Sequence, residues 1–119
     1  MPILDVQVVG DVAESIRAQL ARRIADAAAD VLNSRPQGTW VKVQVLPERD
    51  YAENAGGPEP GVRPVFVAVQ LREPPAGLAL QAQVTALTAA IAEACGRPPE
   101  NVHLQYHPPA PGRVFFGGT

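Results

Sequence analysis

Several features that mark common protein classes are scarce in this 119-residue chain. The single cysteine, Cys95, leaves no partner for an internal disulfide, so we expect a reducing compartment, with the cytoplasm as the default. The net charge is −2 and no basic stripe is present, which argues against nucleic acid because its binding needs clustered positive charge. The two histidines, His103 and His107, have no nearby carboxylate cluster, so the sequence gives little support to a metal site.

Long apolar runs are missing as well. The longest unbroken apolar stretch falls far short of the ~20 residues that a membrane-spanning helix needs, so no membrane partner is expected. The N-terminus lacks a basic region followed by an apolar segment, and we therefore expect no signal peptide. The 46% hydrophobic content is enough for one core, which predicts a single domain over residues 1–119.

Proline and glycine, by contrast, are abundant, with 13 and 10 copies. They gather at residues 56–64, 73–77, 96–99 and 108–118, between segments with periodic apolar residues. This distribution indicates turns and element ends rather than disorder.

The first half of the chain predicts a strand, a helix and a second strand. Apolar and polar residues alternate over 3–9 and again over 40–46, which is typical of half-buried strands. Between them, Asp11 and Glu14 have the spacing of a capping box, and apolar residues follow at helical spacing. We expect this helix to run from about Asp11 to Leu32.

The second half repeats the plan. Residues 65–72 alternate, and Val102 to Tyr106 form a further strand. A helix lies between them, with Gly96 as a C-terminal glycine. Its apolar stripe consists of Leu80, Val84, Leu87 and Ile91. The halves match at an offset of about 61 residues, which predicts an internal repeat of residues 2–57 and 63–118.

Two β-α-β units with right-handed crossovers predict an α+β fold: one four-stranded mixed sheet with both helices on one face. The other face would carry mostly polar residues. It is either left in water or covered by other subunits, and we favour an oligomer. The residues expected on this face are Asp5, Gln7, Lys42, Gln44, Phe66, Ala68, Gln70, Arg72, His103 and Gln105.

Pro2 follows the initiator methionine directly. Because Met1 is normally removed before a small residue, we expect Pro2 to carry a free secondary amine. A chain-terminal amine has a pKa of roughly 7 to 8, and burial in an apolar site lowers it. Such a nitrogen can serve as a general base at neutral pH. The alternative is that position 2 merely tolerates proline.

Pro2, the doubled β-α-β unit and a Gly-Gly pair after each unit together resemble the tautomerase superfamily over essentially the whole chain. Residues 110–118 resemble the C-terminal hairpin of 4-oxalocrotonate tautomerase, and residues 46–57 resemble the same loop at the end of the first unit. Residues 97–106 resemble the last strand of macrophage migration inhibitory factor with its lead-in.

The resemblance implies a homotrimer and chemistry without a cofactor at the N-terminal proline. In the isomerase branch the proline is a base that moves a proton between carbon and oxygen or between carbons. In the dehalogenase branch it is a charged acid while water adds to an unsaturated acid. The counterpart of Pro2 in the second unit is Pro64, whose nitrogen is an amide and carries no proton, so we expect one proline site per chain.

The resemblance also suggests residues that bind a small carboxylate-bearing substrate. Arg72 matches a carboxylate-binding arginine, although the second arginine of that pattern is replaced by Pro75. His103 and Gln105 match site residues on the last strand. For both Arg72 and His103 a structural role, as a solvated or an interface residue, stays an alternative.

Three further candidates are less closely matched. Arg35 lies near the family's site lysine, Tyr51 is a candidate aromatic wall, and Phe116 is expected to line the site or pack at an interface. The dehalogenase route is poorly equipped, because the expected acidic residue near the C-terminus falls within residues 112–117, which contain no acid.

The sequence therefore predicts a cofactor-independent tautomerase that acts on a small enol or 2-oxo acid with Pro2 as the base. One alternative is a hydratase or dehalogenase of an unsaturated acid that uses protonated Pro2. The other is a non-catalytic ligand-binding or signalling module.

Overall fold

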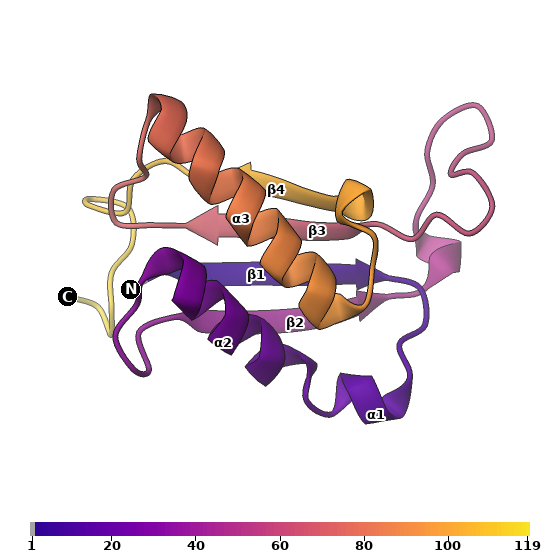
Figure 1. Cartoon of the computed structure of the whole chain (residues 1–119), viewed down its shortest axis with the longest axis horizontal. Coiled ribbons are helices and arrows are strands. Elements are labelled where there is room, and N and C mark those ends of the chain that lie inside the picture. The colour runs from indigo at the N-terminus through magenta and orange to yellow at the C-terminus, as the bar shows by residue number, and fades with distance from the viewer. Residues whose placement is uncertain (1) are drawn as a thin grey trace.

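The computed structural model describes residues 2–119; the predicted removal of Met1 concerns a residue outside this range and stays a prediction. Four strands form one sheet in the order β2-β1-β3-β4 (Figure 1). β1 runs parallel to β2 and antiparallel to β3, and β3 runs parallel to β4. The predicted mixed sheet of two β-α-β units is confirmed. The strands are β1 (Ile3–Val9), β2 (Trp40–Leu46), β3 (Val65–Gln70) and β4 (Val102–Tyr106).

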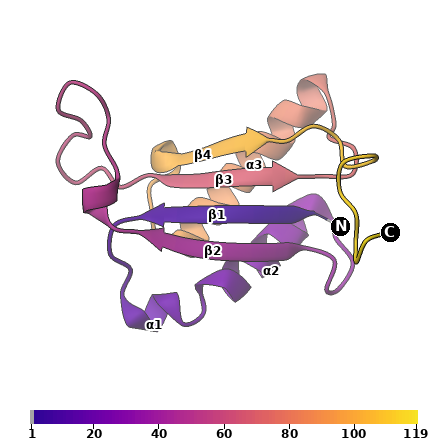
Figure 2. The ribbon, with the colours of Figure 1, turned by 180° about the vertical axis from the view of Figure 1, so that it is seen from behind.

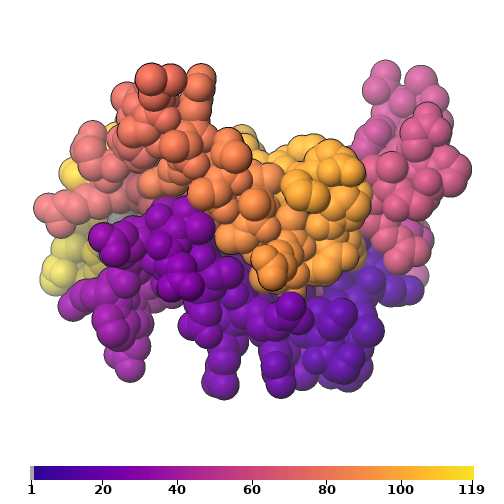
Figure 3. All heavy atoms as spheres, in the orientation of Figure 1, coloured from indigo at the N-terminus to yellow at the C-terminus, as the bar shows by residue number. Residues whose placement is uncertain are grey.

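Both long helices, α2 (Leu20–Leu32) and α3 (Gly77–Cys95), cover the same face of the sheet, as the sequence predicts (Figures 1 and 2). Alternation explains why: every second residue of the central strands is apolar, and these residues are buried beneath the helices. In the space-filling view α2 and α3 lie side by side over the sheet (Figure 3). The central inward residues are Leu4, Val6, Val8, Val65, Val67 and Val69.

The first helix differs from the prediction of one helix from Asp11. A short helix, α1 (Glu14–Arg17), is separated from α2 by a break at Ala18 and Gln19, and the side chain of Asp11 caps neither. The apolar residues from Val12 to Ile24 recur every four residues, and each such step turns a helix about 40° beyond a full turn. Over this stretch a straight helix would rotate the stripe by about 120°, and the break returns it to the sheet.

α3 is continuous and ends at Gly96, which adopts the left-handed conformation predicted for it (φ 66°). Its only charged residue is Glu93, and by length and composition alone it could cross a membrane, with mean hydropathy 1.3 over 18 residues. Core helices pass the same test, and in this fold Leu87 and Ile91 are fully buried against the sheet.

The two units place their strands in the same register. Leu4 lies opposite Val41 in the first unit, and Val65 lies opposite Val102 in the second, each displaced by 61 residues. The face away from the helices is open (Figure 2). It carries the polar residues expected there except Arg72, because β3 already ends at Gln70 and the chain turns away before Arg72.

Candidate functional site

Pro2 lies at one end of the sheet, immediately before β1 (N in Figure 2). Its carbonyl oxygen accepts a hydrogen bond from the backbone N–H of Trp40 at 2.9 Å, which extends the β1–β2 pairing by one residue. On the other side of β1, Ile3 pairs with Gln70, so the chain that follows β3 lies beside Pro2. The half-buried Pro2 is therefore held by backbone contacts between two strands.

A hollow of about 290 Å³, called the proline hollow below, opens at this end of the sheet. Pro2 and Arg72 both line it. A volume of this size suits a small organic acid rather than a large ligand. Within the described range 2–119, Arg72 forms no ion pair with an acidic side chain, so its guanidinium is available to a carboxylate. The lining residues are Pro2, Leu32, Leu71, Arg72, Glu73, Pro75 and Gln83.

The backbone that carries Arg72 is fixed by the C-terminal segment. The side-chain amide of Gln70 donates to the carbonyl of Leu71 at 3.0 Å and to that of Pro108 at 2.9 Å. The N–H of buried Ala110 lies 3.2 Å from the carbonyl oxygens of both Leu71 and Arg72. Because residues 108–110 hold this turn, the exposed Arg72 side chain starts from a defined position beside Pro2.

Two polar residues of the hollow, Glu73 and Gln83, are not predicted from the sequence. Glu73 adds a carboxylate next to the Arg72 cation. Gln83 reaches the hollow from α3, and its Oε1 accepts a hydrogen bond of 2.7 Å from the hydroxyl of Tyr106 on β4. No motif surrounds Gln83, and Gln81 and Thr85 are polar neighbours on the same helix, so no signal in the sequence singles it out.

His103 and Gln105 lie elsewhere, on the open face of the sheet. His103 stacks on Phe66, with ring centroids 5.6 Å apart, and Phe66 pairs with Gln7 of β1. Gln7 is five residues from Pro2, or roughly 16 Å along a strand. Within one chain, therefore, the structure does not bring His103 to the proline.

The open face forms a broad, shallow hollow of about 680 Å³. Lys42 and Asp5 form an exposed ion pair of 2.9 Å within it, so the single lysine has a carboxylate partner in its own chain. The hollow mixes charged, amide and aromatic side chains. Its polar and aromatic lining residues are Asp5, Gln7, Lys42, Gln44, Phe66, His103 and Gln105.

The remaining candidates lie outside the proline hollow. Tyr51 packs against Phe66 at the far end of the open face, with centroids 5.7 Å apart, and its hydrogen bond to Glu53 raises its pKa. Phe116 lies edge-on against Trp40 at 5.6 Å, and thus next to the strand end that holds Pro2. Arg35 is exposed in the turn that leads from α2 to β2.

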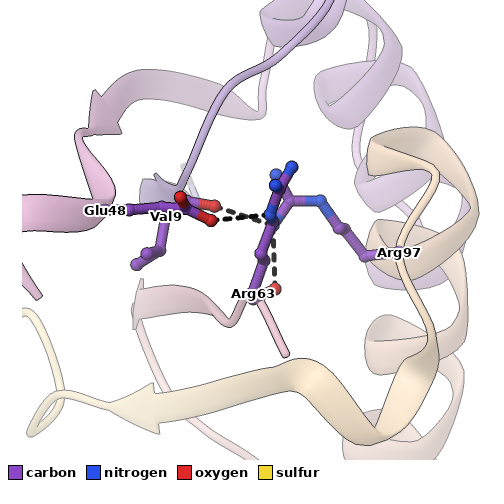
Figure 4. Close-up of polar contacts among 4 residues, drawn as sticks. All are labelled: Val9, Glu48, Arg63 and Arg97. Atoms are coloured by element: carbon purple, nitrogen blue, oxygen red, sulfur yellow. Dashed lines mark hydrogen bonds and ion pairs between the residues drawn. The ribbon is translucent and has the colours of Figure 1, made fainter. Parts of the chain in front are cut away.

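Pro64 precedes β3 as Pro2 precedes β1, and it lies at the opposite end of the sheet, the closed end, where Figure 4 shows the polar contacts of Val9, Glu48, Arg63 and Arg97. Pro64 is fully buried, and its carbonyl accepts the N–H of Val9 at 3.0 Å. Arg97 Nη1 donates to the carbonyl oxygens of Val9 at 3.0 Å and Arg63 at 2.8 Å. Arg63 in turn pairs with Glu48 at 2.8 Å.

The described residues 2–119 contain no group of three or more histidine, cysteine, aspartate or glutamate side chains placed to hold a metal ion. The proline hollow offers one cation, one carboxylate and one amide from Arg72, Glu73 and Gln83.

Comparison with known proteins gives a fold but no close sequence relative. No protein-family model and no curated protein matches the sequence. Among solved structures, Pt0534 inactivated by 2-oxo-3-pentynoate aligns with a TM-score of 0.76 at 18% identity, over 98% of this chain and 93% of that one. Native fused 4-OT aligns with a TM-score of 0.74 at 16% identity, over 98% and 94%.

FG41 malonate semialdehyde decarboxylase inhibited by 3-bromopropiolate aligns with a TM-score of 0.70 at 20% identity, over 97% and 88%. This chain therefore has the fold of the tautomerase superfamily, in its 4-oxalocrotonate tautomerase-like form, and the resemblance found in the sequence is confirmed at the level of the fold.

Proposed function

We propose that this protein is a cofactor-independent tautomerase of a small enol or 2-oxo acid, with Pro2 as the catalytic base. The observation that carries the proposal is that Pro2 and Arg72 line the same small hollow. A base and a carboxylate-binding cation are the two groups that proton transfer within an enol acid requires.

In this reaction the guanidinium of Arg72 holds the substrate carboxylate through two parallel hydrogen bonds. The Pro2 nitrogen then takes a proton from the enol oxygen or from a carbon next to the carbonyl and returns it to another carbon. The nitrogen is basic only if Met1 has been removed, because in a peptide bond its lone pair is delocalised. Processing of the N-terminus is therefore part of the proposal.

The proposal includes a homotrimer, in which the open sheet face contacts neighbouring copies. Two observations support it. Structures of fused 4-OT with this fold form symmetric and asymmetric trimers. In addition, His103 is too far from Pro2 of its own chain to share its substrate, whereas an open sheet face can present His103 and Gln105 to another copy. Light scattering of the purified protein tests the trimer by its mass.

The function is tested by the rate at which wild type and Pro2→Ala convert a simple enol acid, such as phenylenolpyruvate, to its keto form. Wild type is expected to accelerate the conversion, and Pro2→Ala to lose about 100-fold or more. Equal rates would end the proline mechanism, and no acceleration by either protein would favour a non-catalytic ligand-binding module.

Glu73 favours a second candidate, a hydratase of an unsaturated acid. A carboxylate in the hollow stabilises the protonated form of a nearby amine, and protonated Pro2 would act as an acid. A structure with this fold is described in terms of decarboxylase and hydratase activities of malonate semialdehyde decarboxylase. A pH–rate profile separates the two: the tautomerase loses activity as the pH falls through the pKa of the proline, and the hydratase as the pH rises through it.

A further inference from the structure

Gln83 lines the proline hollow from α3, and a hydrogen bond from the β4 side fixes the orientation of its side-chain amide. The hydroxyl of Tyr106, on β4, donates to Oε1 of Gln83 at 2.7 Å. Both side chains are partly buried, so this hydrogen bond lies between the helix layer and the sheet rather than in open water. Among residues 2–119, no group accepts a hydrogen bond from Nε2 of Gln83.

Gln83 lines the hollow, and with Oε1 bonded to Tyr106 its Nε2 is left as the free donor of the side chain. A side-chain amide whose oxygen is held by a neighbour cannot rotate freely, so its two N–H groups keep a fixed direction. The hollow thus contains two donors of different kinds, the charged guanidinium of Arg72 and the neutral amide of Gln83.

We infer that Gln83 is a substrate-binding residue that donates from Nε2 to the 2-oxo (or 2-enol) oxygen, while Arg72 binds the adjacent carboxylate. The inference rests on the proposed function and narrows its substrate class to 2-oxo acids and their enols. A neutral donor stabilises the negative charge that grows on this oxygen when Pro2 removes a proton from the neighbouring carbon. Tyr106 is a positioning residue, since it acts on the substrate only through Gln83.

Tyr106 suits this role because burial raises the pKa of its phenol, so the hydroxyl keeps its proton throughout the neutral range. An ionised phenolate would instead accept from Nε2 and turn the amide around. The Tyr106 ring also packs on the core, which leaves the hydroxyl little freedom to leave Gln83.

The test compares two electrophilic alkynes that a nucleophilic amine can attack. The first, 2-oxo-3-pentynoate, has a 2-oxo oxygen; the second, 3-bromopropiolate, has a carboxylate but no such oxygen. In the first reaction the Pro2 nitrogen adds to the alkyne, one π bond breaks, and the resulting carbanion takes a proton, so the chain gains the whole mass of the probe. In the second the nitrogen bonds to the alkyne carbon that carries bromine, the carbon–bromine bond breaks and bromide leaves while the nitrogen loses its proton, so the chain gains the mass of the acid less that of HBr. Labelling rates are followed by intact-mass spectrometry for wild type and the Gln83→Leu and Tyr106→Phe variants.

Gln83→Leu is expected to slow labelling by 2-oxo-3-pentynoate about 5- to 10-fold and to leave labelling by 3-bromopropiolate within about twofold. Tyr106→Phe, which keeps the ring, should slow only the first probe, by about 2- to 5-fold, and add nothing in the Gln83→Leu background. Equal slowing of both probes would show a structural role for Gln83 and overturn the inference.

Failure of the inference can be told apart from failure of the proposed function. If Pro2 is labelled and Gln83→Leu reacts with 2-oxo-3-pentynoate as fast as wild type, only the role of Gln83 is wrong. If neither probe labels wild-type Pro2, or Pro2→Ala is labelled as fast as wild type, the proline mechanism fails and the role of Gln83 fails with it.

Discussion

At one end of the sheet Pro2 borders a hollow of about 290 Å³, whereas at the other end Pro64 is fully buried among arginine contacts. The two prolines precede β1 and β3, whose pairing to β2 and β4 has the same register. The arginines differ in their partners: Arg72 has no acidic partner in the described range 2–119, and Arg97 donates to two backbone carbonyls.

The difference shows how a doubled chain can separate binding from stability. A terminal nitrogen can carry chemistry only where the chain begins, so the same position in the second unit has no free amine. There Arg97, just after α3, donates to the carbonyl oxygens of Val9 and Arg63 and so ties the end of α3 to the ends of β1 and β3 (Figure 4). We therefore expect substitutions at the Pro2 end to lower activity with little change in stability. Substitutions at the Pro64 end should lower stability and leave activity unchanged.

The largest effect is expected from matched changes at the two prolines. A residue placed before Pro2 turns its nitrogen into an amide and should lower activity about 100-fold or more, while stability stays near that of wild type. Pro64→Ala should keep the activity and lose some stability instead. Ketonisation rates and urea unfolding of both variants check this, and an active capped variant would contradict the comparison.

The arginines give the next largest effect. Arg72→Ala removes a charge-assisted contact to the substrate and should lower kcat/KM about 10- to 100-fold with little change in stability. Arg22→Ala, a change of an exposed arginine on α2, is the matched control and should have neither effect. A normal kcat/KM for Arg72→Ala would remove Arg72 from the site.

Arg97→Met should show the reverse pattern. It keeps the apolar stem but leaves the carbonyl oxygens of Val9 and Arg63 without their donor. The expected cost is about 1–3 kcal/mol in the free energy of unfolding, with kcat/KM per folded chain unchanged. Urea denaturation measures the first quantity, and a loss of activity without a loss of stability would place Arg97 in the chemistry.

Cys95 gives the smallest effect at neutral pH and tests the closed end only in alkali. Burial raises the pKa of its thiol to about 11, although nearby Arg97 and Arg23 oppose the shift. Because the unfolded thiol loses its proton first, this contribution to stability is full below about pH 8.5 and is lost as the pH rises to about 11.

The total loss from the thiol is about 3 kcal/mol. It should be absent in Cys95→Ala, as the unfolding free energies of both proteins at several pH values between these limits would show. The same alkaline loss in both proteins would mean that the thiol is not buried in the closed end.

Much of the fold follows from periodicity in the sequence. Alternation of apolar and polar residues places the four strands. The glycine after the apolar stripe predicts the end of α3, and Gly96 ends it in the left-handed conformation. The break between α1 and α2 was not predicted, because the four-residue spacing from Val12 to Ile24 looks helical locally and fails only when its rotation is summed along the helix.

The site is predictable only in part. Pro2 is predicted from its place after Met1 and Arg72 from the family resemblance, and the two line one hollow. The separation of His103 from Pro2 depends on register, since β4 runs parallel to β3 and begins at the end of the sheet opposite Pro2. Gln83 depends on a contact between α3 and β4 that no local pattern encodes.

The claim that Pro2 carries a free, titratable nitrogen is tested most directly by an NMR titration of protein labelled with ¹⁵N-proline. Only a chain-terminal proline nitrogen can gain or lose a proton, and the other members of the set of 13 prolines are amides. We predict that one proline nitrogen titrates with a midpoint below about pH 8, and that its signal is absent in Pro2→Ala. If no proline nitrogen titrates, Pro2 is capped and the catalytic account is wrong.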